Sequence, residues 1–281
     1  MPYRHRAAAY RSPVAANGDS WEAIDGPAGR LSVHISTRDG PGQDVPLLLL
    51  CHELPRGTGG ARDAGRAYPG LADYLSAETG LRVVAALLRG TGESDGNFSA
   101  GGWLEDLRFV LEREAGPATE VWAVGFGLGA ALALRLALAE ERVRGVAIVA
   151  GPADLAGWVA DTVGVLDRCR RSGVISSPGF PSDVDAWAEE LVALAPLDAA
   201  AHLGSRPLLV IHGSDDGEVP AAAARALADA AAPNGPVDLR IVPGGGHWLR
   251  ADPRVVATLV GWLDPMPGEH CPQEVSGAGI G

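Results

Sequence analysis

The chain has 281 residues and a formal net charge of −12, from 23 basic and 35 acidic side chains. A protein this acidic is not expected to bind nucleic acid through its phosphate backbone. All 23 basic residues are arginine, which excludes a Schiff-base lysine, a pyridoxal-phosphate lysine and a P-loop lysine. The length and the 47% apolar composition fit a single α/β domain with an inserted segment.

The cysteine pattern predicts neither a disulfide framework nor a zinc site. Cys51, Cys169 and Cys271 are far apart, and no Cys-x-x-Cys pair occurs. We therefore predict no metal and no cofactor, and we expect a reducing, cytoplasmic setting. Residues 1–16 lack the apolar run of a signal peptide, and no stretch of 18 apolar residues predicts a membrane span.

In chain order, residues 1–18 are predicted to form an irregular arm. Apolar and polar residues alternate over 20–25 and 30–37, on either side of a Gly-Pro-Ala-Gly turn, which predicts a β-hairpin. Residues 45–51 form a continuous apolar run, which is typical of a strand buried on both faces of a parallel sheet.

Apolar runs and helical patterns then alternate along the chain. Strands are predicted at residues 82–88, 120–124, 143–150, 207–211 and 239–242, and helices at residues 103–114, 128–140, 221–231 and 253–263. This alternation indicates βαβ units, and therefore an α/β fold with a mostly parallel, doubly wound sheet.

One segment interrupts the alternation, because about 55 residues after position 150 contain no strand pattern. Two helical patterns, at 154–171 and 183–194, predict a small helical cap over residues 151–205, inserted in a domain that spans 19–264. The segment 265–281 is rich in glycine and proline and is predicted to be disordered.

Within the predicted cap, two kinds of side chain allow more than one interpretation. Trp158 and Trp187 either line a pocket or pack in the core. The clustered Arg168, Arg170 and Arg171 are interpreted as a solvated helix end.

A glycine-rich turn joins the predicted strand at 120–124 to the helix that follows it. Gly125 and Gly129 flank this turn, and the absence of a Cβ at both positions allows the strand and the helix to approach closely. The central residue is Gly127, and no Ser, Cys, Thr or Asp occurs between Val124 and Leu134.

Two later loops carry a carboxylate and a histidine. The strand at 207–211 is followed by His-Gly-Ser-Asp-Asp-Gly, which contains Asp216 and, as a second candidate, Asp215. The strand at 239–242 is followed by Pro-Gly-Gly-Gly-His, which ends at His247. Each loop also has a structural interpretation. Ser-Asp-Asp-Gly is a favourable turn sequence in which Asp216 would cap the turn, and His247 could be a hydrogen-bonded histidine with a purely structural role.

Two further motifs follow the first two strands of the predicted parallel sheet. Residues 50–55 read Leu-Cys-His-Glu-Leu-Pro, which places Glu53 after a histidine, and residues 88–94 read Leu-Arg-Gly-Thr-Gly-Glu-Ser. Cys51 is expected to be a buried core thiol. Arg89 is expected to brace its loop, and Glu53 is either a solvated loop carboxylate or a side chain of the site.

In this order, the motifs resemble those of the α/β-hydrolase superfamily, over about residues 20–263. In serine ester and peptide hydrolases of this family, the central residue of the turn is the nucleophile. The resemblance therefore implies Gly127 at the nucleophile position, Asp216 and His247 as its partners, and an oxyanion hole formed by the N–H groups of Leu54 and Leu128. Glu53 stands where the family usually has glycine.

The missing nucleophile leaves several functions open. The chain is expected to lack ordinary acyl-enzyme hydrolysis and to bind a small acyl or apolar ligand, or a partner; the sequence does not predict its oligomeric state. Alternatively, the Asp216–His247 pair acts as a general base on water or on an acidic substrate, without a cofactor. A third interpretation is that Gly127 replaces serine in an otherwise intact site. A gain of activity on short p-nitrophenyl esters in Gly127→Ser would support this third interpretation.

Overall fold

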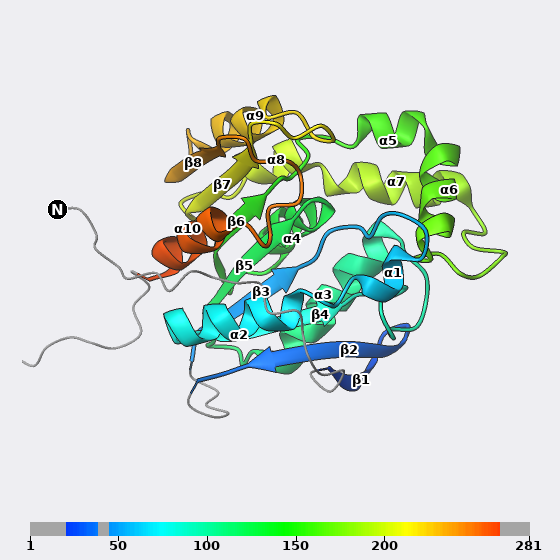
Figure 1. The fold of residues 1–281 in the computed structure, drawn as a ribbon, viewed down its shortest axis with the longest axis horizontal. Helices are drawn as coiled ribbons and strands as arrows, with labels where there is room; N and C mark the ends of the chain where they lie inside the picture. The colour runs from blue at the N-terminus through cyan, green and yellow to red at the C-terminus, as the bar shows by residue number, and fades with distance from the viewer. Residues whose placement is uncertain (1–20, 39–44, 265–281) are drawn as a thin grey trace, which may run out of the picture.

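A computed structural model describes residues 21–38 and 45–264 of the chain. The predicted arm at 1–18 and the predicted tail at 265–281 lie outside the described residues. The described part contains an eight-stranded sheet in the order β1-β2-β4-β3-β5-β6-β7-β8 (Figure 1). The strands are β1 (Glu22–Gly26), β2 (Gly29–Ser36), β3 (Leu47–Cys51), β4 (Arg82–Leu87), β5 (Val121–Phe126), β6 (Val143–Val149), β7 (Leu208–Gly213) and β8 (Val237–Val242).

The predicted hairpin and the mostly parallel sheet are both confirmed. β1 pairs with β2, and β2 pairs with β4, in antiparallel fashion, whereas every pairing from β4 to β8 is parallel. All five residues of β3 are buried, as a strand covered on both faces requires.

Helices cover both faces of the sheet, and each face has its own apolar core. The helices are α1 (Gly60–Asp63), α2 (Tyr68–Thr79), α3 (Ala100–Glu114), α4 (Leu128–Ala139), α5 (Ala156–Ala160), α6 (Thr162–Ser172), α7 (Val184–Leu194), α8 (Pro196–Ala201), α9 (Ala222–Ala231) and α10 (Pro253–Leu263). The side chains of α2 and α10 form one core, and those of α3, α4, α8 and α9 contribute to the other. Among residues 21–38 and 45–264, every helix is too short or too polar to span a bilayer.

The segment between β6 and β7 contains four helices rather than the two predicted ones. The predicted helix at 154–171 is divided, because the Asp161 carboxylate accepts a hydrogen bond from Gly164 N and starts α6. α8 packs against α4 and α9 in the main body. Figure 1 shows α5, α6 and α7 grouped beyond one end of the strands.

Candidate active site

The turn between β5 and α4 has a backbone conformation that favours glycine. Gly127 has φ 53° and ψ −121°, and its N–H donates to Val149 O at 2.9 Å. A Cβ on Gly125 would lie 2.3 Å from Gly129 O, and one on Gly129 would lie 2.2 Å from Cys51 O. Only glycine therefore fits at the two flanking positions, which fixes the close approach of strand and helix predicted from the sequence.

Asp216 and His247 are joined by a hydrogen bond between Oδ2 and Nδ1, at 2.9 Å. The Asp216 side chain is fully buried, and its Oδ1 accepts the N–H groups of Glu218 and Val219, each at 2.9 Å. Because Nδ1 donates to a carboxylate, Nε2 of a neutral His247 ring is an acceptor.

The structure brings this pair to Gly127, which is 120 residues away from His247 in the sequence. A Cβ built on Gly127 would lie 3.7 Å from His247 Nε2. Asp215, the second candidate acid, is directed elsewhere, because its carboxylate accepts from Ser214 Oγ at 2.6 Å. A residue that sequence reasoning missed, His212, also contacts Asp216, with Nε2 3.2 Å from Oδ2.

The loop after β3 is held by a buried histidine. His52 Nδ1 donates to Glu53 O at 2.8 Å, and His52 Nε2 accepts the Leu88 N–H at 3.1 Å. This loop carries Leu54, which lines the same cavity as Gly127 and Leu128. The Leu128 N–H lies in the first turn of α4, where no intrahelical acceptor exists, so it is available to a bound oxygen.

Burial lowers the pKa of His52 from 6.5 to about 4, which makes the stability of the fold depend on pH. Above pH 6.5 the ring is neutral in both states; as the pH falls toward 4, the unfolded chain binds a proton that the folded chain rejects. We expect the free energy of unfolding to fall by about 3 kcal/mol across that window. Chemical denaturation at several pH values measures it. His52→Asn removes most of this slope, whereas the exposed His202→Gln retains it; an unchanged slope in His52→Asn would contradict the assignment.

Glu53 is paired rather than solvated, and it faces a different cavity. Its carboxylate forms an ion pair with Arg250, and the Glu53 side chain is only 12% exposed. Burial raises the pKa of Glu53, and the nearby Arg250 charge opposes that rise. Glu53, Arg250, Tyr68 and Trp248 line a cavity of about 270 Å³ that adjoins the site. The carboxylate is thus neutralised beside the site rather than exposed in the cavity of Gly127.

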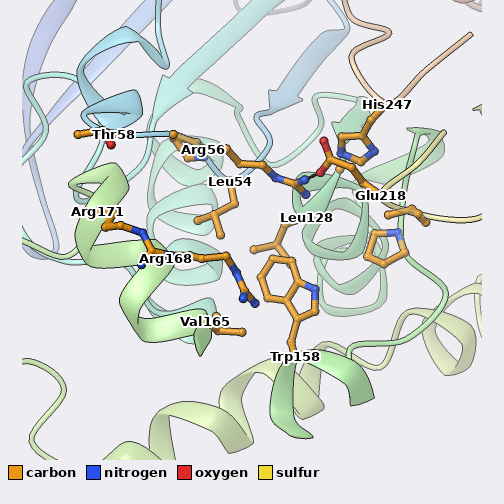
Figure 2. Close-up of a pocket in the computed structure, with 15 residues that line it drawn as sticks. Leu54, Arg56, Thr58, Leu128, Trp158, Val165, Arg168, Arg171, Glu218 and His247 are labelled. Carbon is orange, nitrogen blue, oxygen red and sulfur yellow. Dashed lines mark ion pairs between the residues drawn. The ribbon is translucent and has the colours of Figure 1, made fainter. Parts of the chain in front are cut away.

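A cavity with a volume of about 570 Å³ lies over Gly127. Its walls come from the loop after β3, the start of α4, the loop after β7, and helices α5 and α6. It is lined by Leu54, Pro55, Arg56, Gly57, Thr58, Gly127, Leu128, Pro152, Trp158, Val165, Arg168, Arg171, Glu218, Val219 and His247. Figure 2 shows Arg56 paired with Glu218 next to His247. The cavity therefore joins apolar walls to several charged groups.

All three arginines of the α6 cluster are exposed, as the interpretation of a solvated helix end requires, but two of them also line the cavity. Arg168 and Arg171 line the cavity, whereas the guanidinium of Arg170 donates to Phe180 O at 3.3 Å. The spacing of Val165, Arg168 and Arg171 is the signal that could have revealed this, because residues three apart share one side of a helix.

The structure also shows where the two tryptophans of the segment 151–205, Arg89 and Cys51 lie. Trp158 lines the cavity, whereas Trp187 is buried in the core and donates to Phe98 O at 3.0 Å. Arg89 braces its loop as expected, through hydrogen bonds to the buried Asp106 carboxylate. Cys51 is a fully buried thiol, and burial raises its pKa to about 12.

The sequence matches the model of the family described as "Alpha/beta hydrolase family" over residues 48–259. The match covers more than half of the chain, so the protein belongs to the alpha/beta hydrolase family. A search of curated protein sequences found no match.

Several solved structures share this fold. An alpha-beta serine hydrolase homologue from Coxiella burnetii is 22% identical, with a TM-score of 0.55, over 88% of this chain and 96% of that chain. A mutant of the meta-cleavage product hydrolase from Pseudomonas fluorescens, complexed with acetates, is 19% identical, with a TM-score of 0.59, over 86% and 97%. Est1E from Butyrivibrio proteoclasticus, with ferulic acid bound, is 17% identical, with a TM-score of 0.59, over 86% and 96%. These similarities establish the fold.

Proposed function

We propose that the protein takes a small organic molecule into the cavity over Gly127, and that His247, oriented by Asp216, acts on it as a general base. The proton acceptor is His247 Nε2, and the donor is a water molecule or an acidic group of the substrate. The observation that carries this proposal is the intact Asp216–His247 hydrogen bond beside a residue with no side chain. A buried pair whose free nitrogen faces a cavity has the geometry that general-base catalysis requires.

The same geometry argues against an acyl-enzyme intermediate. Gly127 offers no attacking atom, and the segment from Val124 to Leu134 contains no Ser, Thr, Cys or Asp. In the described part of the chain, the side-chain hydrogen bond of His247 goes to Asp216. Loss of the nucleophile from a catalytic triad costs roughly 10⁶ in turnover. Chemistry at this site therefore proceeds without covalent attachment to residue 127.

The remaining parts of the site suit a reaction in which an oxygen gains negative charge. Leu54 and Leu128 line the cavity beside Gly127, and a backbone N–H group that donates to a developing oxyanion is worth about 3 kcal/mol. Helices α5 and α6 supply Trp158 and Arg168 to the lining of the cavity, and we expect them to act as its cap.

Reaction with a fluorophosphonate probe and with p-nitrophenyl butyrate tests this proposal. We expect no covalent labelling and no burst of p-nitrophenol, because no acyl-enzyme accumulates. Any steady-state turnover should require the His247 imidazole, because its Nε2 accepts the proton. Intact-protein mass spectrometry and stopped-flow absorbance provide the two measurements. A labelled residue in the turn or a stoichiometric burst would contradict the proposal.

The position of Glu53 favours a second candidate, a binding protein with no catalysis. Glu53 directly precedes Leu54, whose N–H is the expected oxyanion donor, and a carboxylate near that donor opposes negative charge on a substrate oxygen. Its ion pair with Arg250 reduces this effect. Binding of a ligand in the cavity, with equal reaction rates in the wild type and in His247→Gln, would support the second candidate over the first.

A further inference from the structure

The cavity over Gly127 carries more positive than negative charge, although the protein as a whole is acidic. Three arginines line it, Arg56, Arg168 and Arg171, against the single carboxylate of Glu218. The chain has a net charge of −12. A concave group of cations in an acidic protein creates a local potential that concentrates small anions. The charge distribution thus distinguishes this cavity from the rest of the molecule.

Two of these arginines are free to contact a ligand. Arg56 is engaged by Glu218 in an ion pair. The carboxylate partner of Arg168 is Asp161, at 3.4 Å, and both side chains are more than half exposed, so this pair is weak. Among the described residues, Arg171 forms no ion pair. Two guanidinium groups on one side of α6 therefore lack a strong intramolecular counter-ion.

The cavity between these arginines and the histidine is mostly apolar. Figure 2 shows His247 and Glu218 at one end of the view, and α6 with Arg168 and Arg171 at the other, with Leu54 and Leu128 drawn between them. Trp158 and Val165 complete this apolar part. A molecule that fills the cavity thus meets cations at one end, an apolar wall in the middle and the imidazole at the other end.

We propose that Arg168 and Arg171 form an anion subsite, and that the ligand of this cavity is a small apolar molecule that bears a carboxylate or phosphate group. Guanidinium groups bind planar and tetrahedral oxyanions through paired hydrogen bonds. A cavity of about 570 Å³ holds such a molecule with its anionic group on α6 and its reactive part at His247. This inference rests on the proposed function, because it names the substrate class for the same cavity.

Calorimetric titration of the full chain with benzoate, phenyl phosphate and benzamide tests the subsite. We expect at least one anion to bind about tenfold or more tightly than the neutral amide, because a charge-assisted hydrogen bond contributes that much or more. A preference for benzoate identifies a carboxylate ligand, and a preference for phenyl phosphate identifies a phosphate ester. Similar affinity for all three compounds, or no binding of any of them at millimolar concentration, would overturn the inference.

Variants of the same helix provide the matched controls. Arg168→Gln combined with Arg171→Gln should abolish the preference for the anion, whereas Arg170→Gln should retain it, because Arg170 does not line the cavity. Equal losses in both variants would overturn the subsite. His247→Gln should retain the preference, so binding and catalysis are measured separately. If the preference survives but no substrate shows turnover dependent on His247, the proposed function fails and the anion subsite stands.

Discussion

Gly127→Ser alone is expected to leave ester hydrolysis near the wild-type rate, whereas Gly127→Ser with Glu53→Gly should raise it at least about a hundredfold. That gain is a small part of the roughly 10⁶ that a triad nucleophile contributes. A serine Cβ at residue 127 would lie 3.7 Å from His247 Nε2, so its hydroxyl can come within hydrogen-bond reach. The same Cβ would lie only 3.1 Å from Glu53 Cβ, which must move to admit it. Removing the Glu53 side chain relieves this contact.

Two control variants separate the contributions to this result. Glu53→Ala removes the carboxylate but keeps the Cβ, so Gly127→Ser with Glu53→Ala should remain slow if the contact is limiting. Gly127→Ala introduces the same backbone strain without a hydroxyl. Both Gly127 variants should lose about 1–3 kcal/mol of stability, because φ 53° is unfavourable for a residue with a Cβ. Initial rates with p-nitrophenyl acetate and chemical denaturation provide the measurements. Full activity in Gly127→Ser alone would refute the role of Glu53.

His247→Gln is expected to lower any turnover by about 10²–10⁴, the usual contribution of a general base. Asp216→Asn should cause a comparable loss, because an amide cannot hold the His247 ring with Nδ1 protonated and Nε2 free. The amide oxygen of the variant can still accept the Glu218 and Val219 N–H groups, which leaves its NH2 group facing His247 Nδ1 in place of the carboxylate oxygen.

His202→Gln is the control for these substitutions, since His202 is an exposed histidine that pairs with Asp198 and does not line the cavity. Its turnover should equal that of the wild type. Steady-state rates measure the effect, and the loss should appear in His247→Gln and Asp216→Asn but not in His202→Gln. An unchanged rate in His247→Gln would exclude the general-base assignment.

Most of the sheet could be predicted from the sequence, because its strands are either continuously apolar or regularly alternating. α2 was not predicted, although a crossover between β3 and β4 was required. This helix begins Tyr-Pro-Gly, and Pro69 and Gly70 are weak helical signals in a sequence, even though proline is favourable in a first turn. The division between α5 and α6 depends on the capping side chain of Asp161, which no periodicity reveals.

Some residues of the candidate site could be predicted from the sequence, and others could not. Gly127, Asp216 and His247 belong to loops with distinctive motifs, and the structure brings them together. The ion pair of Glu53 with Arg250 joins residues 197 positions apart, so local sequence cannot indicate it. The sequence did not reveal that Arg168 and Arg171 line the cavity, because both side chains are exposed and only the three-dimensional position of α6 shows that they also border the site.

The glycines in the turn between β5 and α4 differ in how strictly the structure requires them. A Cβ on Gly125 or Gly129 would clash with backbone atoms, so the fold does not accept another residue at either position. A Cβ on Gly127 would lie 3.1 Å from Glu53 Cβ and 3.7 Å from His247 Nε2, so a substitution there is strained but not blocked by the backbone. Random mutagenesis of this turn should therefore yield folded variants chiefly with substitutions at Gly127, the position at which a nucleophile would stand. The protein is thus a favourable starting point for directed evolution of new chemistry.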